Sequence, residues 1–299
     1  MPDADVRRFV QKFAGMTLSG DTREKVVVVA FGGGDNGKTT FVETLQHIHG
    51  DDYTSVAPES TIAAKNDRQE GVPNDIARLR GSRLVVVSET SEGARLNEGR
   101  VKAMTGRNKI SARFMRGEWF DFWPEFKLLV ETNHRPMVKG TDNAIWNRLK
   151  LVPFTVTIPE DEQDKGLPKA IRSELSGILN WLVAGCLDWL AGGLGEPQAV
   201  TDATGEYRGA LDVIGDFLSD MCEQSEGRRV AAGDLYRAYK GWVVNVRGEQ
   251  HPMSMTRFGE LMIERGFTRK ETNRGRVYHG LTLRLASLFV NDAEKADVA

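Results

Sequence analysis

A glycine-rich segment that directly follows an apolar run constrains this chain most. The run at 25–29 reads KVVVV, and the segment at 30–41 reads AFGGGDNGKTTF. The β-branched run predicts a buried strand, and the following FVETLQHI predicts a helix. Successive glycines between them allow backbone amides to close around an anion, because no side chains stand in the way. The sequence therefore predicts a strand–loop–helix unit with an anion site at its turn.

The residue types in this segment match a nucleotide phosphate loop of the pattern G-x-x-x-x-G-K-T. A helix that starts near Lys38 aims its unpaired N–H groups and its positive end at the loop. Lys38 is placed to reach the β and γ phosphates of ATP, and the Thr39 hydroxyl is placed to ligate Mg²⁺. The alternative is a simple glycine turn. The residues expected to contact ATP here are Gly32, Gly33, Gly34, Asp35, Asn36, Gly37, Lys38, Thr39 and Thr40.

Three later apolar runs predict further buried strands, of the kind found in a parallel sheet. They are RLVVVSET at 83–90, KLLVETN at 127–133 and RLKLVPF at 148–154. Glu89 ends the first run and is the candidate to polarise the attacking water and to help hold the metal. Asn133 ends the second run and is a candidate to hold that water or to contact the γ phosphate. Taken alone, Glu89 could instead be a surface residue and Asn133 a turn former.

The segment NKISARFMRGEWFDFW at 108–123 predicts a β-hairpin inserted between the second and third strands. Gly117 is expected at its turn, with Arg113 and Arg116 on or near the tip. Its aromatic residues could stack on bases, but the stronger expectation is that they brace the hairpin as core. These residues are Phe114, Trp119, Phe120, Phe122 and Trp123.

Taken in order, these segments resemble one family. The chain is similar to the superfamily 3 helicases of the phage and plasmid primase-helicase type, which are related to poxvirus and papillomavirus replicative helicases. The motifs that carry the resemblance are GGGDNGKT at 32–39, LVVVSE at 84–89, LNEGRVKAMTGRNKISARFMRGEWF at 96–120 and LLVETNHRP at 128–136.

The resemblance implies an α/β fold: an AAA+-type P-loop ATPase with a parallel central sheet and an inserted pore hairpin. It implies a homo-oligomer, a hexameric ring, that binds ATP and Mg²⁺ between subunits and pulls single-stranded DNA through a central pore in the 3′ to 5′ direction. Arg148 stands where the family places an arginine finger, and Lys102 where a basic residue reaches the neighbour's nucleotide. Arg113 and Arg116 fall in the pore hairpin. Ser88 stands where many P-loop ATPases have an aspartate, so Thr39, Glu89 and water are the expected metal ligands.

The flanks predict further parts. Helical spacing of apolar residues at 4–18 predicts a helix, and 170–194 predicts a long amphipathic helix whose tryptophans are core. The order of three helices and a hairpin after residue 211 is that of a winged helix. It binds either duplex DNA or a protein. Its candidate phosphate contacts are Arg257, Arg269, Lys270, Arg274 and Arg276.

The expected domains are an N-terminal helix at 1–24, the ATPase core at 25–160, a helical region at 161–210, the winged helix at 211–286 and a tail at 287–299. The stretches 192–197 and 223–229 are the candidate hinges, by glycine and polar content. No polymerising primase domain fits within the chain, so we expect either a stand-alone helicase or the C-terminal piece of a primase-helicase.

The net charge of −2 hides an uneven distribution. Residues 100–150 carry 11 basic and 5 acidic side chains and 228–284 carry 12 and 5, whereas 161–227 carry 4 and 13. Two basic blocks predict two places that hold a phosphate backbone.

Two cysteines without metal spacing argue against zinc and disulfides, and no apolar run approaches the ~20 residues of a membrane span. With no secretory signal at the N-terminus, we expect a protein of the bacterial host's cytoplasm.

Three functions remain open. The leading interpretation is an ATP-dependent replicative DNA helicase of a phage, prophage or plasmid-like element. The second is an ATP-switched replication initiator or loader with little processive unwinding. The third is a P-loop small-molecule phosphotransferase, which the inserted hairpin and Arg148 disfavour.

Overall fold

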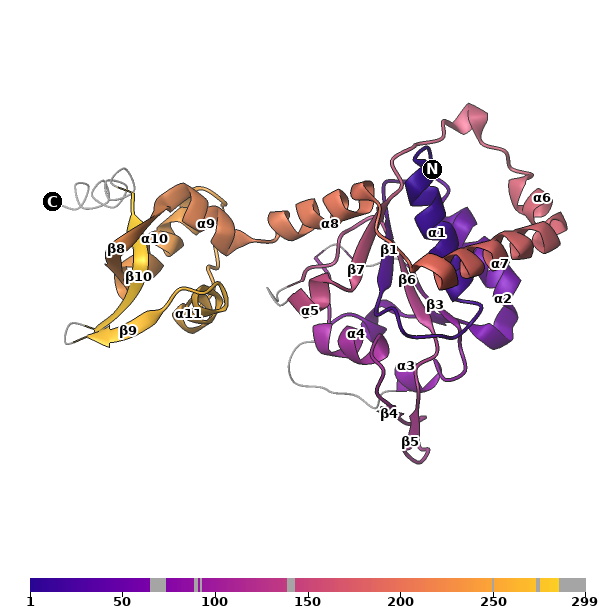
Figure 1. Cartoon of the computed structure of the whole chain (residues 1–299), viewed down its shortest axis with the longest axis horizontal. Coiled ribbons are helices and arrows are strands. Elements are labelled where there is room, and N and C mark those ends of the chain that lie inside the picture. Colours follow the sequence, from indigo (N-terminus) through magenta and orange to yellow (C-terminus); the bar gives the residue numbers. More distant parts are fainter. Residues whose placement is uncertain are drawn as a thin grey trace. The chain divides into compact units, whose positions relative to one another are not determined.

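The apolar runs predicted to be buried strands lie side by side in one parallel sheet (Figure 1). Its order is β2-β3-β6-β1-β7, and all four pairings are parallel. The strands are β1 (Val27–Phe31), β2 (Thr54–Ala57), β3 (Leu84–Ser88), β6 (Lys127–Thr132) and β7 (Leu149–Pro153). The expected parallel central sheet is therefore confirmed, with β1 between β6 and β7.

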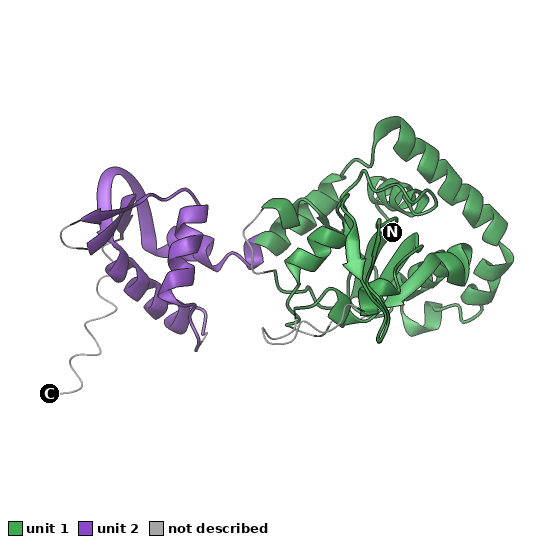
Figure 2. Ribbon diagram, turned by 90° about the horizontal axis from the view of Figure 1, so that it is seen from below, with its two compact units in different colours: residues 1–208 green, residues 209–299 purple. Residues whose placement is uncertain are grey.

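The computed structural model describes residues 1–64, 74–88, 91, 93–138, 143–248, 250–272 and 275–284. The chain divides into two units, Met1–Arg208 and Gly209–Ala299 (Figure 2). The sheet lies in the first unit. The second unit has a hydrophobic core of its own.

Both faces of the central strands are buried, as the near-continuous apolar runs require. On one face, Val28, Leu84 and Leu129 belong to a core cluster that also contains residues of three helices. These helices are α1 (Ala4–Met16), α2 (Lys38–Tyr53) and α7 (Leu175–Gly192). Helix α1 confirms the predicted N-terminal helix; its N-cap Asp3 accepts hydrogen bonds from the N–H groups of Asp5 and Val6.

Helices α1 and α7 meet backbone to backbone at two glycines. A Cβ atom at Gly15 would lie 2.2 Å from the backbone nitrogen of Cys186, and one at Gly185 would lie 2.2 Å from the carbonyl oxygen of Gln11. No other residue fits at this separation. The contact fixes α1 against α7 over the sheet.

The long helix predicted at 170–194 is interrupted. Helix α6 (Leu167–Ser173) ends at Glu174, where α7 begins in a new direction (Figure 1). The prediction that both tryptophans are core is wrong for one of them: Trp189 is buried, but Trp181 is 38% exposed. Leu182 and Trp189 belong to the core cluster that includes α1, and Trp181 lies outside it.

Another side of α7 is also apolar, with Leu179, Val183, Leu187 and Leu190 exposed. By length and composition α7 is apolar enough to cross a membrane, with a mean hydropathy of 1.3 over 18 residues. This corrects the expectation that no run approaches that length. Some of the apolar residues of α7 pack against α1 in the core, which accounts for part of this hydropathy.

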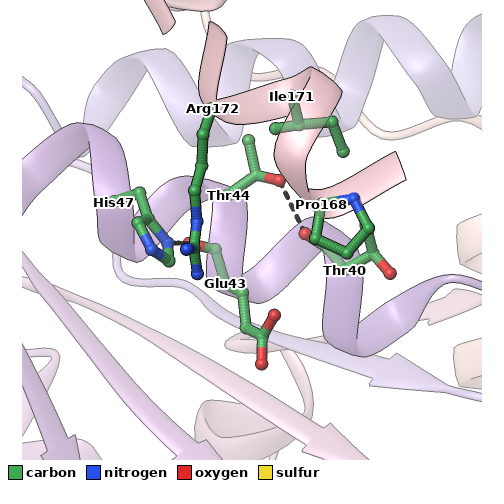
Figure 3. A pocket seen from close by; sticks show the side chains of 7 residues that line it. All are labelled: Thr40, Glu43, Thr44, His47, Pro168, Ile171 and Arg172. Carbon is green, nitrogen blue, oxygen red and sulfur yellow. Dashed lines mark hydrogen bonds between the residues drawn. The ribbon is translucent and has the colours of Figure 1, made fainter. Parts of the chain in front are cut away.

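Helix α6 lies across α2 (Figure 3). The polar side chains at this crossing bond to the helix backbone: Thr44 Oγ1 donates to the carbonyl oxygen of Thr40 at 2.6 Å, and His47 Nδ1 to that of Glu43 at 2.6 Å. The cavity between the helices measures only about 10 Å³. The crossing is therefore a packing contact and holds no ligand-sized space.

The rest of the first unit is short segments around the sheet. A two-stranded hairpin of β4 (Ile110–Ala112) and β5 (Phe120–Phe122) confirms the insertion predicted between the second and third strands. The remaining elements are η1 (Glu59–Thr61), α3 (Asn74–Ala77), α4 (Glu98–Met104), α5 (Asn143–Trp146), η2 (Glu160–Glu162) and α8 (Gln198–Ala210).

Within its described residues, the second unit combines three helices with a three-stranded antiparallel sheet of order β8-β10-β9. Its elements are α9 (Val213–Met221), β8 (Cys222–Ala231), α10 (Ala232–Asn245), α11 (Met255–Glu264), β9 (Arg269–Thr272) and β10 (Gly275–Leu283). Helices form where the sequence predicts them. The aromatic ring of Phe217 packs edge-on against Tyr239, Trp242 and Phe258, at 5.5, 5.9 and 6.1 Å between centroids.

The hinge predicted at 223–229 is wrong, because this stretch lies inside β8. Cys222, Glu223 and Gln224 pair with the end of β10, and Arg229 pairs again with His279 after a register shift. The glycine and polar residues between them form a bulge of the strand, with Gly227 at φ 78°. The polar composition marks an exposed edge strand and not a linker.

The close approach of α1 and α7 can be tested by substitution. Gly185→Ala forces a methyl group into backbone atoms, and overpacking of this kind costs about 1–3 kcal/mol. Gly177→Ala, on the same helix but with open space around its Cβ, is the matched control. It is expected to stabilise by up to about 1 kcal/mol through helix propensity. Urea unfolding of both variants measures the difference, and equal stability would contradict the close contact.

Candidate functional site

The glycine-rich loop connects β1 to α2 at the carboxyl edge of the sheet. A Cβ atom at Gly32 would lie 2.3 Å from the carbonyl oxygen of Phe154, so only glycine fits there. Gly37 has φ 81° and caps α2, and Asp35 takes the left-handed φ of 55°. The expected loop and helix start are confirmed, and the loop is held in a conformation that most residues resist.

Two side chains fasten the loop. The ammonium group of Lys38 donates to the carbonyl oxygens of Gly32 at 2.9 Å and Gly33 at 2.6 Å, and to Asn36 Oδ1 at 3.0 Å. Asn36 Nδ2 donates to the carbonyl oxygens of Gly33 at 2.8 Å and Phe154 at 3.2 Å. Asn36, expected only as an ATP contact, thereby ties the loop to the residue after β7.

Lys38 is buried, with 5% of its surface exposed. Burial lowers the pKa of its ammonium group, and the negative charge of Glu131 acts in the opposite direction. The positive charge is thus held at the base of the loop, within the influence of a carboxylate.

A cavity of about 250 Å³ opens at this edge. It is lined by residues of the loop, the first turn of α2 and the end of β6, namely Gly34, Asp35, Asn36, Gly37, Lys38, Thr39, Thr40, Glu131, Thr132 and Asn133. The structure therefore brings most of the predicted ATP contacts together with Asn133, which is exposed.

Glu131 is the residue that the sequence analysis missed. Thr39 Oγ1 donates a hydrogen bond to Glu131 Oε1 at 2.5 Å. Glu131 is only 9% exposed, in a strand whose six residues are all buried. An acid directly after the apolar residues Leu128, Leu129 and Val130 of a predicted buried strand was the available signal, because a buried charge is costly unless it is paired or hydrogen-bonded.

The oxygens of Thr39 and Glu131 are hard ligands of the type that Mg²⁺ prefers, so the site fits that ion. Among the described residues, no group of three His, Cys, Asp or Glu side chains lies close enough to hold a metal by itself. Glu89, the predicted second ligand and base, lies outside the described residues. A metal here depends on oxygens from a bound phosphate as well.

Arg148 lies at the opposite edge of the sheet. It precedes β7, and its carbonyl oxygen accepts from Val27 N, the first residue of β1, at 2.8 Å. A five-residue strand separates it from the loop, about 16 Å at 3.3 Å per residue. Its Nε donates to Thr105 Oγ1 at 3.1 Å. Arg148 cannot reach the loop of its own chain.

Arg148 instead lines an open groove of about 910 Å³ at the amino edge of β1 and β7. Arg23, Lys25 and Lys150 also line it, and Lys150 is paired with Glu196 at 2.5 Å. Lys102 lies on α4, half-buried. The predicted finger therefore sits among other cations, away from the cavity at the carboxyl edge.

Cations lie against the aromatic rings of the hairpin. Within the hairpin, Arg113 lies over the ring of Trp119 at 5.0 Å and Lys109 over that of Trp123 at 5.8 Å. Arg80, from the turn after α3, lies over the ring of Phe120 at 5.3 Å. Arg116 is exposed at the tip, with a left-handed φ of 62° next to Gly117. The sequence analysis predicted the turn and the place of both arginines in the hairpin correctly.

The expectation that the aromatics brace the hairpin as core is wrong for three of them. Of the five, Phe122 is buried and Phe120 is half-buried. Phe114, Trp119 and Trp123 are 49%, 57% and 56% exposed. A two-stranded ribbon has too little surface to cover all of its large side chains.

In the second unit, the predicted cations differ in their surroundings. Arg257 is paired with Glu260 at 3.1 Å and Glu264 at 3.5 Å. Arg276 faces Glu271 at 3.8 Å across β9 and β10. Arg269 and Lys270 are exposed on β9, and Arg274 lies outside the described residues.

Two family models match the chain. Residues 30–148 match a family of unknown function (DUF5906), and residues 211–282 match the Poxvirus D5 protein-like family. The first match spans the loop, the hairpin and Arg148, and the second spans most of the second unit.

Curated relatives come from large DNA viruses. A protein named "putative helicase" of Acanthamoeba polyphaga mimivirus is 28% identical over 260 residues, covering 81% of this chain and 27% of its own length. A "putative helicase" of Frog virus 3 is also 28% identical over 260 residues, covering 81% and 26%. The chain thus spans about a quarter of the length of these relatives.

The solved C-terminal region of NrS-1, residues 305–718 in its apo form, matches with a TM-score of 0.56 at 12% identity, covering 94% of this chain and 72% of that one. This likeness shows a shared fold. The Poxvirus D5 protein-like segment and the similarity to named viral helicases confirm the predicted resemblance to the superfamily 3 primase-helicase type.

Proposed function

We propose that this chain is the motor part of a replicative DNA helicase, an AAA+-type P-loop ATPase that works as a ring. One observation carries the proposal. Lys38, Thr39 and Asn133 gather around one cavity at the carboxyl edge of the sheet, whereas Arg148 lies at the amino edge. Such a separation is expected when two subunits complete one site.

The roles at the cavity follow from the contacts. The N–H groups of the loop and the start of α2 bind the phosphates, and Lys38 turns its ammonium group from the loop carbonyls to the β and γ phosphates. Asn133 orients the attacking water, and Glu89, by its place after β3, accepts its proton. Bound Mg²⁺ supplies further charge neutralisation on the phosphates.

The neighbouring subunit supplies the remaining charge. Arg148, with Lys102, approaches the γ phosphate in the adjacent subunit's cavity, and hydrolysis then requires assembly. We propose a homo-hexamer, as the family resemblance implies. The groove around Arg148 is the surface that faces the neighbour.

The hairpin grips single-stranded DNA in the central pore. Exposed Trp119 and Trp123 offer faces on which bases stack, and Arg113 and Lys109 lie against the same rings. Because six copies surround one strand, few cations per subunit suffice. Movement in the 3′ to 5′ direction is carried over from the resemblance.

The second unit is proposed to be a winged helix in which β9 and β10 form the wing. Exposed Arg269 and Lys270 support contact with duplex phosphates. Docking of a protein partner is the alternative. These cations also support the second candidate function, an ATP-switched initiator or loader that binds an origin with little processive unwinding. Fork unwinding with ATP, compared with origin melting alone, separates the two.

The proposed setting is replication of a phage, prophage or plasmid-like element in a bacterial cytoplasm. The curated relatives come from large DNA viruses and support the replication role and not this particular host. A small-molecule phosphotransferase has no need of the inserted hairpin, so this function is the weakest of the three.

Arginine action in trans has a direct test. Arg148→Ala is expected to bind ATP but to turn it over about 10³- to 10⁵-fold more slowly, and Lys38→Ala to lose hydrolysis. Mixing the two variants should restore part of the activity, because some interfaces then combine an intact Lys38 with an intact Arg148. Lys169→Ala, an exposed cation on α6 outside this groove, is the control and should turn over ATP normally. If the mixture stays inactive, Arg148 does not act in trans.

The hairpin makes a separate prediction. Trp119→Ala should weaken single-strand binding by about 1–3 kcal/mol, because a base can no longer stack there. Arg113→Ala with Arg116→Ala should lower the salt slope by about 0.7 for each phosphate that the hairpin no longer neutralises. DNA-independent ATP hydrolysis should persist in both. The control is Arg7→Ala with Arg8→Ala on α1, which removes the same charge elsewhere. Unchanged affinity of the hairpin variants, measured by fluorescence anisotropy, would refute the pore assignment.

The cations of the second unit are expected to contribute unequally to duplex binding. Arg269→Ala with Lys270→Ala should weaken duplex binding and reduce its salt slope by about 0.9 for each phosphate that is no longer neutralised. Arg257→Ala should have a smaller effect, because two glutamates already neutralise this guanidinium. A duplex affinity that none of these changes alters would assign the unit to protein docking.

A further inference from the structure

Glu131 is a buried carboxylate in the central sheet, and burial of a charge needs a physical explanation. It lies near the carboxyl end of β6, in the middle of the sheet, with β3 on one side and β1 on the other. Its carboxylate accepts one hydrogen bond in the described structure, from Thr39 Oγ1 at 2.5 Å. No salt bridge joins it to any described residue. Hydrophobic packing does not account for a carboxylate that is 9% exposed in this strand.

The sheet register relates Glu131 to Ser88. The two residues are direct Cα partners of the parallel strands β3 and β6. Lateral partners in a parallel sheet project from the same face, about 4.8 Å apart. Ser88 stands where many P-loop ATPases have an aspartate that helps to hold Mg²⁺. The carboxylate is thus present at the same level of the sheet, one strand over.

The hydrogen bond also sets what Thr39 can do. A threonine hydroxyl has one proton and two lone pairs. Because the proton goes to Glu131, the lone pairs of Thr39 Oγ1 remain available to a cation. The negative charge of Glu131 makes Thr39 Oγ1 a stronger lone-pair donor to a cation. The same charge also acts on Lys38, because it counteracts the lowering of the pKa of that ammonium group.

We propose that Glu131 is the metal-organising carboxylate of this ATP site, replacing the aspartate that is absent at Ser88. This rests on the proposed function, because it assumes that ATP and Mg²⁺ bind in the cavity. Glu131 fixes the Thr39 hydroxyl and accepts from water that the cation carries. Glu89 is left free for the water that attacks the phosphate.

The test separates metal from nucleotide. Binding of a fluorescent ATP analogue is measured in excess EDTA and in excess Mg²⁺, and Mn²⁺ binding in the presence of ADP is followed by electron paramagnetic resonance. The wild type should bind more tightly with Mg²⁺. Glu131→Gln, which preserves shape and can still accept from Thr39, should keep its affinity in EDTA but bind the metal about 10- to 100-fold more weakly.

A second variant, which moves the carboxylate from position 131 to position 88, tests the proposal more strictly. Ser88→Asp in the Glu131→Gln background places an acid at the lateral partner position and should regain part of the Mg²⁺-dependent affinity and of the Mn²⁺ signal. Glu43→Gln is the control: it removes the same charge from an exposed side chain of α2 and should leave both readouts unchanged.

The outcomes are distinct. If the wild type binds no nucleotide in either condition, the proposed function fails. If the wild type shows the Mg²⁺ effect and Glu131→Gln retains all of it, the role of Glu131 is refuted while the ATP site stands. A Glu131→Gln variant that loses affinity in EDTA as well, or gains nothing from Ser88→Asp, also contradicts the proposal, since Glu131 would then support the loop and not the metal.

Discussion

The candidate site depends on the hydrogen bonds that the Lys38 ammonium group donates to the carbonyl oxygens of Gly32 and Gly33. It closes a loop whose backbone takes left-handed values at Asp35 and Gly37. Asn36 then joins this loop to Phe154, the residue that follows β7. The ends of β1 and β7 are thereby held together, and the cavity takes its shape from the sheet and its loops and not from freely rotating side chains.

The same sheet imposes a separation. Parallel strands bring all carboxyl ends to one edge and all amino ends to the other, so residues before and after a strand cannot meet within one subunit. Thr39 and Asn133 gather at the carboxyl edge, while Arg148 is fixed at the amino edge by its backbone pairing with Val27 and its hydrogen bond to Thr105. If ATP hydrolysis uses both edges, the fold itself requires a second copy. Assembly would then be a consequence of strand direction.

Sequence reasoning succeeded where local pattern decides structure. Strands buried on both faces form unbroken apolar runs in the sequence, and the loop glycines mark the turn into α2, so the loop and four of the five strands were predictable. The edge strand β2 was not predicted, because only one of its four residues is buried and its sequence forms no apolar run. The bulged strand β8 was not, because its pairing with β10 depends on residues about 50 positions away. The exposure of Trp119 and Trp181 was also missed, since it depends on which side of an element lacks a neighbour. Glu131 was overlooked because its meaning comes from two distant residues, Thr39 across the loop and Ser88 across the sheet.

Net charge says little about where this chain can hold an anion; the pairing of each cation says more. Arg257 belongs to a basic block, yet two glutamates surround it. Arg113 and Lys109 lie against the rings of Trp119 and Trp123, which attract a cation through their π faces without cancelling its charge. A phosphate backbone approaching the hairpin therefore meets cations that keep their charge, beside faces that accept bases. If the hairpin binds single-stranded DNA as proposed, this arrangement explains how a chain of net charge −2 can do so.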